Sequence, residues 1–171
     1  LYKGHRLLSI DGSIINLPLS KDTIRAFGTH NNQNKTDDLV LGRVSIMYDL
    51  LNEIVIDGIL CAINKSEVPL SRKHIALAQE NDILIMDRGY PSFESIFEMD
   101  QRKIHFIFRC KTSFNTEVAK FALSKKKEEL ILIKPAAHRS CKGLPYNKSA
   151  FVEVRLIKVK LDSGEIEILM T

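Results

Sequence analysis

The chain has 171 residues, 44% of them hydrophobic, and this length and composition are sufficient for one substantial core. No run approaches the roughly 18 consecutive apolar residues of a transmembrane helix, and the first residues lack the plan of a secretory signal. Its three cysteines argue against a disulfide framework, and the net charge of +4 permits a nucleic-acid partner without requiring one. We therefore expect a soluble, cytoplasmic protein without a membrane partner.

The chain begins with a short predicted strand that ends in an acidic residue. Residues 7–10 are apolar and run directly into Asp11. Gly12 and Ser13 follow and are predicted to turn the chain. The polar stretch over residues 20–38 is rich in Asn, Asp, Thr and Gly, which predicts a loop or surface excursion.

The next segments predict a hairpin, a helix and a second strand that ends in an acidic residue. Apolar residues alternate over 44–50 and 54–60, as is typical of a β-hairpin. Residues 71–80 carry helix formers with apolar positions at helical spacing. The apolar run over residues 83–86 predicts a buried strand, and Asp87 follows it immediately.

The order of elements favours a mixed sheet with helices packed on it. Pro91 and Ser92 are suited to the first turn and cap of a helix with Phe93 on its apolar face, and residues 104–108 predict the next strand. The pattern of strand, loop, hairpin, helix, strand, helix, strand predicts a mixed α/β fold. It is not the alternation of a doubly wound nucleotide-binding fold.

The last third of the chain differs from the rest in its strand pattern and its content of basic residues, which predicts a second lobe. Residues 130–133 resemble a strand, and residues 151–170 resemble a hairpin that turns at Asp-Ser-Gly. Basic residues are also more frequent here than before. We therefore predict a core over residues 1–111 and a β-rich, basic lobe over residues 112–171.

Asp11 and Asp87 are the candidates for chemistry, because each follows a predicted strand. Neighbouring parallel strands lie about 4.8 Å apart, so carboxylates at their tips can share divalent metal ions. Such ions activate a nucleophile and stabilise the leaving oxygen in phosphodiester cleavage, and carboxylates suit Mg²⁺. The alternative is that each aspartate is an ordinary turn or capping residue after a buried strand.

Basic side chains are the candidates for DNA contacts, because phosphate contacts need cations rather than a particular order of residues. An arginine contacts phosphate through the two parallel N–H donors of its guanidinium. Tyr90, by contrast, is predicted to belong to the core. The candidates are Arg88, Arg109, Lys111, Lys125, Lys126, Lys127, Arg139 and Lys142. The alternative for the lysines is a solvated charged face.

Several short motifs are spread over most of the chain and are specific in combination. They are Asp11-Gly12-Ser13, Asn16-Leu17-Pro18, Ala26-Phe27-Gly28, Asp87-Arg88-Gly89-Tyr90 and the Phe-Ile-Phe-Arg pattern at 106–109. In this combination the chain resembles bacterial insertion-sequence transposases of the DDE class. The resemblance implies that Asp11 and Asp87 are catalytic metal ligands for Mg²⁺, with Mn²⁺ as a substitute.

The resemblance also implies an RNase H-like core with a β-rich insertion before the helix that bears a third acid. That acid belongs to a Tyr-x2-Arg-x3-Glu-x6-Lys motif, which this sequence lacks. We therefore expect a core truncated before its final helix, with the third acid beyond Thr171. Glu94, Glu165 and Glu167 are not expected to replace it, and the chain alone is expected to be inactive.

The full-length protein is expected to act on transposon ends and target DNA. The resemblance also implies that it can form a homodimer and that it associates with the nucleoid. Two other classes of function stay open from the sequence. One is an RNase H-like nuclease of another kind, and the other is a decayed or domesticated DNA-binding protein that lacks the reaction. Sequence beyond Thr171 would separate transposase from nuclease, because only the former requires the Tyr/Arg/Glu/Lys helix.

Overall fold

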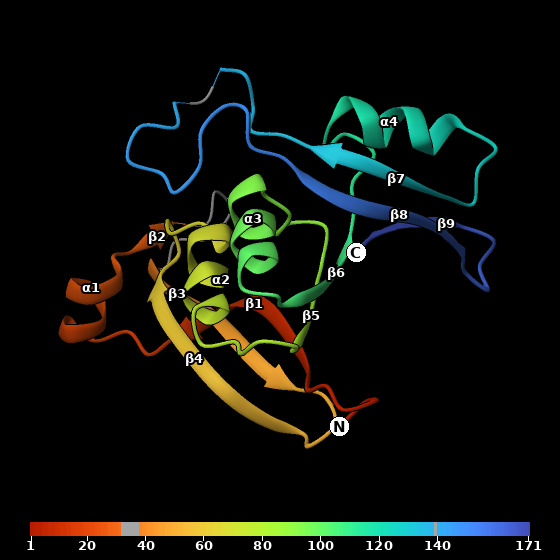
Figure 1. Ribbon diagram of the computed structural model, residues 1–171. Helices are drawn as coiled ribbons and strands as arrows, with labels where there is room; N and C mark the ends of the chain where they lie inside the picture. Colours follow the sequence, from red (N-terminus) through yellow and green to blue (C-terminus); the bar gives the residue numbers. More distant parts are fainter. Residues whose placement is uncertain (32–37, 139) are drawn as a thin grey trace.

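The computed structural model of the chain describes residues 1–31, 38–138 and 140–171. Within them, nine strands form one mixed sheet (Figure 1). The strands are β1 (Leu7–Leu17), β2 (His30–Asn31), β3 (Asp38–Asp49), β4 (Ile54–Ala62), β5 (Ile83–Met86), β6 (His105–Arg109), β7 (Glu128–Ile133), β8 (Val152–Lys160) and β9 (Ile166–Met170). The helices are α1 (Lys21–Phe27), α2 (Glu67–Ile75), α3 (Phe93–Gln101) and α4 (Thr116–Leu123). None of the helices described is long and apolar enough to cross a membrane.

The sheet combines parallel strands at its centre with antiparallel strands on both sides. Its order is β2-β3-β1-β5-β6-β9-β8-β7, with β4 paired to β3. Strand β5 is parallel to both β1 and β6, and the other neighbours are antiparallel. The predicted mixed α/β fold class is thereby confirmed, and the order β4-β3-β1-β5-β6 is consistent with an RNase H-like core.

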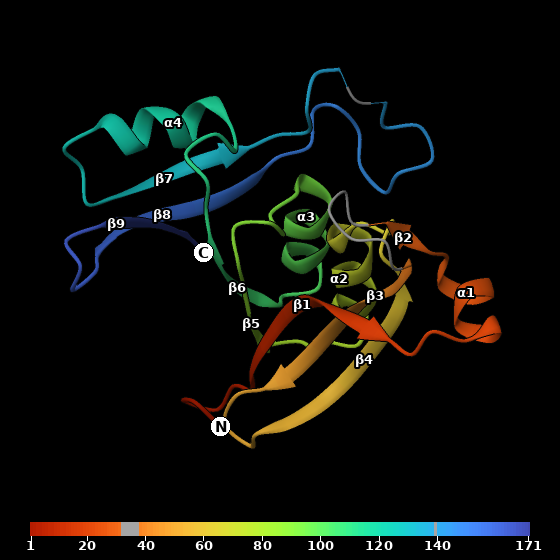
Figure 2. The ribbon, with the colours of Figure 1, turned by 180° about the vertical axis from the view of Figure 1, so that it is seen from behind.

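The central strands bury one face and leave the other partly open. Helices α2 and α3 lie on the same side of the sheet in both views (Figures 1 and 2). Leu8, Leu84 and Phe108 point toward this side and are fully buried in the same core as the apolar residues of the two helices. The alternate residues Ser9 and Ile85 are only partly buried, because side chains of successive strand residues point to opposite faces.

Strand β1 is longer than predicted, and the prediction of a turn at Gly12 and Ser13 is wrong. Hydrogen-bonded pairing with β3 continues from Leu8 to Leu17, so both residues lie inside the strand. A long antiparallel partner satisfies the backbone along the whole segment, and this outweighs the local turn tendency of a glycine and a serine. The expected loop over residues 20–38 contains helix α1, which begins with a capping box made by Ser20 and Thr23.

Helix α2 begins and ends earlier than the predicted residues 71–80. Arg102, at the end of α3, donates to the carbonyl oxygens of Ile75 at 2.8 Å and Ala78 at 2.5 Å. Its side chain therefore satisfies carbonyl groups at and just after the C-terminus of α2. Tertiary contacts therefore set this boundary. Helix α4 was not predicted, although Asn115 accepts a hydrogen bond from the Val118 amide as a typical N-cap.

The remaining predicted elements are present. The hairpin of β3 and β4, strands β5 to β9 and helix α3 capped by Ser92 lie where the sequence places them. Strand β9 pairs with β6 through Arg109 and Leu169, so the sheet is continuous between residues 1–111 and 112–171. The boundary between these two parts stays a prediction, and it falls between β6 and α4.

Candidate functional site

Three charged residues occupy one row across the parallel centre of the sheet. Ile10 of β1 pairs with Met86 of β5, and Met86 pairs with Phe108 of β6. These three are buried on the helix side, so the next residues, Asp11, Asp87 and Arg109, follow on the opposite face. Two carboxylates and a guanidinium are thus placed on successive strands about 4.8 Å apart.

The two aspartates reach this row in different ways. Asp87 follows the last residue of β5, as expected, whereas Asp11 lies inside β1 and not at its tip. The candidate site therefore lies where β5 ends, beside the middle of β1. It opens into a cavity of about 480 Å³. The residues around this cavity are Ser9, Ile10, Asp11, Ile85, Met86, Asp87, Ile107, Arg109 and Leu169.

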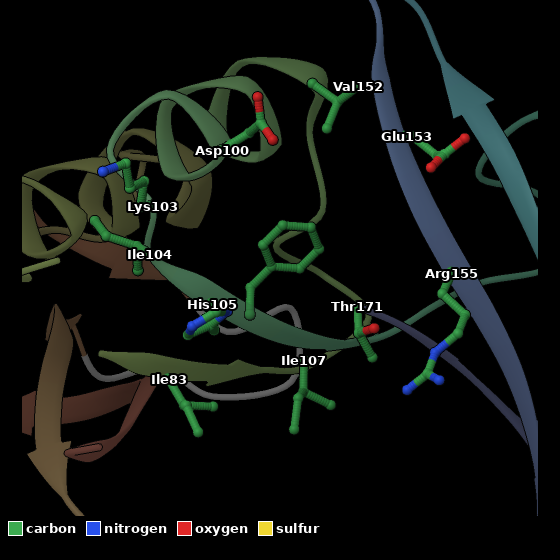
Figure 3. A pocket seen from close by; sticks show the side chains of 11 residues that line it. Ile83, Asp100, Lys103, Ile104, His105, Ile107, Val152, Glu153, Arg155 and Thr171 are labelled. Atoms are coloured by element: carbon green, nitrogen blue, oxygen red, sulfur yellow. The ribbon is translucent and has the colours of Figure 1, made fainter. Parts of the chain in front are cut away.

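A larger cavity of about 540 Å³ lies elsewhere, between β6, α3 and β8 (Figure 3). Its charged side chains stand on two sides, with Asp100 and Lys103 on one and Glu153 and Arg155 on the other. Neither aspartate of the site contributes to it. We assign the chemistry to the smaller cavity, because that one gathers the two carboxylates on adjacent parallel strands.

Arg109 links Asp87 to a carboxylate that sequence reasoning did not place here. Its Nη1 lies 3.1 Å from Oδ1 of Asp87, and its Nη2 lies 2.5 Å from Oε1 of Glu167. Arg88 also contacts Glu167, with Nη2 donating to Oε1 at 2.9 Å. Hydrogen bonding from Arg109 holds the pKa of Glu167 below its ordinary value, so this carboxylate stays charged.

Glu167 was not expected to replace the third acid, and its contact with the arginine beside Asp87 was not predicted. It does not join Asp11 and Asp87 as a third ligand in any described cluster, but it touches the arginine that contacts Asp87. The pairing of β9 with β6 brings it there. The register of an inserted hairpin against the core cannot be derived from its own alternation, so the sequence offered no signal for this contact.

Tyr90 supports the other aspartate from within the core, where it was predicted to lie. It is only 3% exposed, and its Oη lies 3.5 Å from Oδ1 of Asp11. Burial raises the pKa of the Tyr90 hydroxyl, with the charges of Glu67 and Asp11 adding to the effect, so the hydroxyl remains a donor. A side chain at Gly12 would put its first carbon 3.2 Å from this oxygen, which is closer than ordinary van der Waals contact.

The donor set fits a hard divalent ion that completes its coordination with other groups. Asp11 and Asp87 offer carboxylate oxygens, and Mg²⁺ commonly takes one or two protein carboxylates together with water and substrate phosphates. In the described part of the chain, no group of three or more His, Cys, Asp or Glu side chains is arranged to hold a metal. Asp11 and Asp87 thus offer two carboxylates beside a cavity of about 480 Å³.

The candidate DNA-contacting residues fall into separate groups. Arg88 and Arg109 meet at Glu167, and Lys111 follows two residues later and lines a neighbouring cavity with Arg88. Residues 125–127 precede β7, whereas Lys142 lies in the segment between β7 and β8. Lys126 is paired with Glu129 at 2.5 Å. Arg139 lies outside the described residues.

Comparison with known proteins identifies the family. A family model described as the transposase DDE domain matches residues 2–151. The chain belongs to the transposase DDE domain family. Members of this family generally use divalent metal ions, which agrees with the carboxylate donors of the site. No curated protein sequence matches the chain.

The fold of this transposase DDE domain is similar to that of a solved transposase. The match is to the piggyBac transposase in a synaptic complex with hairpin DNA, with a TM-score of 0.52 and 13% sequence identity. It covers 96% of this chain and 32% of that chain. The present chain therefore spans about a third of the piggyBac protein, and the likeness concerns the fold.

Proposed function

We propose that the chain is the larger part of the catalytic domain of a DNA transposase from a bacterial insertion sequence. The full-length protein would cleave DNA at transposon ends and join the freed ends to target DNA, in the bacterial cytoplasm at the nucleoid. Family membership supports this proposal. The observation that carries it is the placement of Asp11 and Asp87 in one row of adjacent parallel strands, on the open face of the sheet.

Asp11 and Asp87 are the proposed metal ligands and catalytic residues. The ion is Mg²⁺, with Mn²⁺ as a substitute, and when bound it supplies the Lewis acid for phosphodiester cleavage and strand transfer. Tyr90 directs its hydroxyl at Asp11, and Arg109 balances the charge of Asp87. The contact from Tyr90 holds Asp11 in place before the ion and DNA arrive, so less reorganisation of that carboxylate is needed on binding.

Basic residues of the chain are proposed to hold the DNA. Arg88, Arg109 and Lys111 lie near Asp87 and are suited to the phosphates next to the reacting bond. The lysines of the segment 125–127 and Lys142 extend along the inserted lobe, where they would contact the flanking backbone. Contacts of this kind make binding weaken steeply with salt.

The third acid of the site is proposed to lie beyond Thr171, and the full-length transposase is proposed to work as a homodimer across two ends. The chain alone is then inactive, because two carboxylates do not complete the site. Supercoiled plasmid incubated with the chain and Mg²⁺ should stay intact. Cleavage that disappears in Asp87→Ala would contradict this part of the proposal.

An excision assay tests the function in the full-length protein. A reading frame that contains this chain is expressed beside a reporter interrupted by the element and its ends. Asp11→Asn and Asp87→Asn should each reduce excision to the background level, because each removes a charged ligand and keeps the size of the side chain. The matched control is Asp162→Asn, the same change at the exposed turn between β8 and β9. Excision that survives Asp87→Asn would refute the proposed function.

A further inference from the structure

Glu167 is a nearly buried carboxylate that sits between two arginines of the site. Its side chain is only 11% exposed, although β9 belongs to the inserted hairpin and not to the parallel centre of the sheet. Arg88 contributes one contact, at 2.9 Å, and Arg109 contributes two. A charge so little exposed needs partners of opposite sign, and Glu167 has two.

The contacts of Arg109 are divided unequally between its two acidic neighbours. Nη2 donates to Oε1 of Glu167 at 2.5 Å and Nε donates to Oε2 at 3.3 Å, so one edge of the guanidinium faces Glu167. Only Nη1 remains for Asp87, at 3.1 Å from Oδ1. The planar, rigid guanidinium cannot turn the same edge to both carboxylates at once. The position of Glu167 therefore decides how much of Arg109 reaches Asp87.

This division matters because a guanidinium and a divalent cation need the same carboxylate oxygens. An arginine that pairs with a carboxylate through two parallel hydrogen bonds uses both oxygens. Arg109, held edge-on by Glu167, reaches Asp87 with Nη1, which lies 3.1 Å from Oδ1. Without Glu167, Asp87 would be the nearest remaining acidic partner in this cluster, and Arg109 would be free to turn its two-donor edge toward it.

We propose that Glu167 is a positioning residue that restrains Arg109 and thereby keeps Asp87 available to a divalent cation. The carboxylate itself does not touch the ion in this arrangement. It acts through Arg109, and the neighbouring contact with Arg88 fixes its own direction. This inference rests on the proposed function, since it takes Asp87 as the metal ligand.

Binding of Mn²⁺ to the 171-residue chain, followed by electron paramagnetic resonance, tests the inference without any catalytic reaction. Glu167→Gln keeps the shape of the side chain and removes its charge. It should weaken Asp87-dependent Mn²⁺ binding by about fivefold to tenfold, which lies within the range of coupling between contacting residues. Arg109→Gln alone should strengthen binding, and the double variant Glu167→Gln/Arg109→Gln should bind at least as tightly as the unaltered chain.

Glu165→Gln is the matched control, because it removes the same charge from the same hairpin. It should change Mn²⁺ binding by less than about twofold. This control separates the effect of the Glu167 contact with Arg109 from the effect of removing one negative charge from the hairpin. Thermal unfolding of every variant shows whether the fold is retained. Removal of Arg109 also removes the unpaired charge that Glu167→Gln leaves behind, so the unfolding temperature is compared with Mn²⁺ binding in each variant. Mn²⁺ binding that recovers in the double variant without a matching rise in unfolding temperature indicates positioning, whereas binding that follows the unfolding temperature through all variants indicates structural damage and would overturn the inference.

Each outcome has a defined meaning. Asp87-dependent binding that Glu167→Gln leaves unchanged would overturn this inference and leave the proposed function standing. Weakened binding that the double variant does not restore would also overturn it. If the unaltered chain and Asp87→Ala bind Mn²⁺ equally, the metal site of the proposed function fails, and the role of Glu167 fails with it.

Discussion

The ion pair between Arg6 and Asp82 joins the residues just before β1 and β5, the two strands that deliver the aspartates. Nε of Arg6 donates to Oδ1 at 2.8 Å and Nη2 donates to Oδ2 at 2.5 Å. The amide of Gln79 also donates to Oδ2, at 2.7 Å. The Asp82 side chain is 5% exposed and that of Arg6 is 28% exposed. We expect this pair to stabilise the fold far more than a surface pair does.

The substitution Asp82→Ala removes the acceptor of all three bonds and leaves a half-buried guanidinium without its partner. Breaking a buried pair costs about 3–5 kcal/mol, whereas exposed pairs contribute about 0.2–1 kcal/mol. Because Arg6 is partly exposed, we expect about 3 kcal/mol. In a domain of this size, that loss lowers the unfolding temperature by about 6–12 °C. Circular dichroism during heating measures it.

Glu80→Ala is the control for this experiment. Glu80 pairs with Lys103 at 3.1 Å, but the two side chains are 59% and 76% exposed, so the expected loss is within about 1 kcal/mol. If Asp82→Ala and Glu80→Ala unfold within about 2 °C of each other, the reasoning from burial is refuted for this pair. Removing Arg6 as well should recover part of the loss, because the unpaired charge is then gone.

Three further predictions concern other contacts of the core. Tyr146→Phe deletes the hydroxyl that donates to buried Glu94 at 2.8 Å, and urea unfolding should show a loss of about 1–3 kcal/mol; an unchanged midpoint would contradict this. His74→Leu removes the ring that contacts Asp57 at 2.8 Å and Ser45 at 3.0 Å, and should cost a similar free energy in the same assay, with Tyr2→Leu at the exposed N-terminus as the neutral control. Burial raises the pKa of Cys110 to about 11, so iodoacetamide at pH 8 should label it last of the cysteines, and faster as the pH approaches 11; mass spectrometry that finds it labelled first would disprove this.

The elements predicted correctly are those whose pattern is local. The hairpin of β3 and β4 shows in alternation, strand β5 in a short apolar run, and helix α3 in the cap at Ser92. Helices α1 and α4 were missed although each begins with a local cap, whereas two other errors are boundaries set by partners. Strand β1 continues past Gly12 because β3 pairs with it, and α2 ends at Ile75, whose carbonyl oxygen accepts a hydrogen bond from the side chain of Arg102.

By itself, the sequence determined the fold class, the family resemblance and the two acidic residues that follow buried strands, because these depend on residue types and local periodicity. Only the tertiary structure decided that Asp11 lies inside its strand, in the same row as Asp87 and Arg109. It also decided that Glu167 contacts the arginine beside Asp87. Strand order and register arise from pairing between distant segments, and the alternation of one strand does not specify which neighbour it will meet.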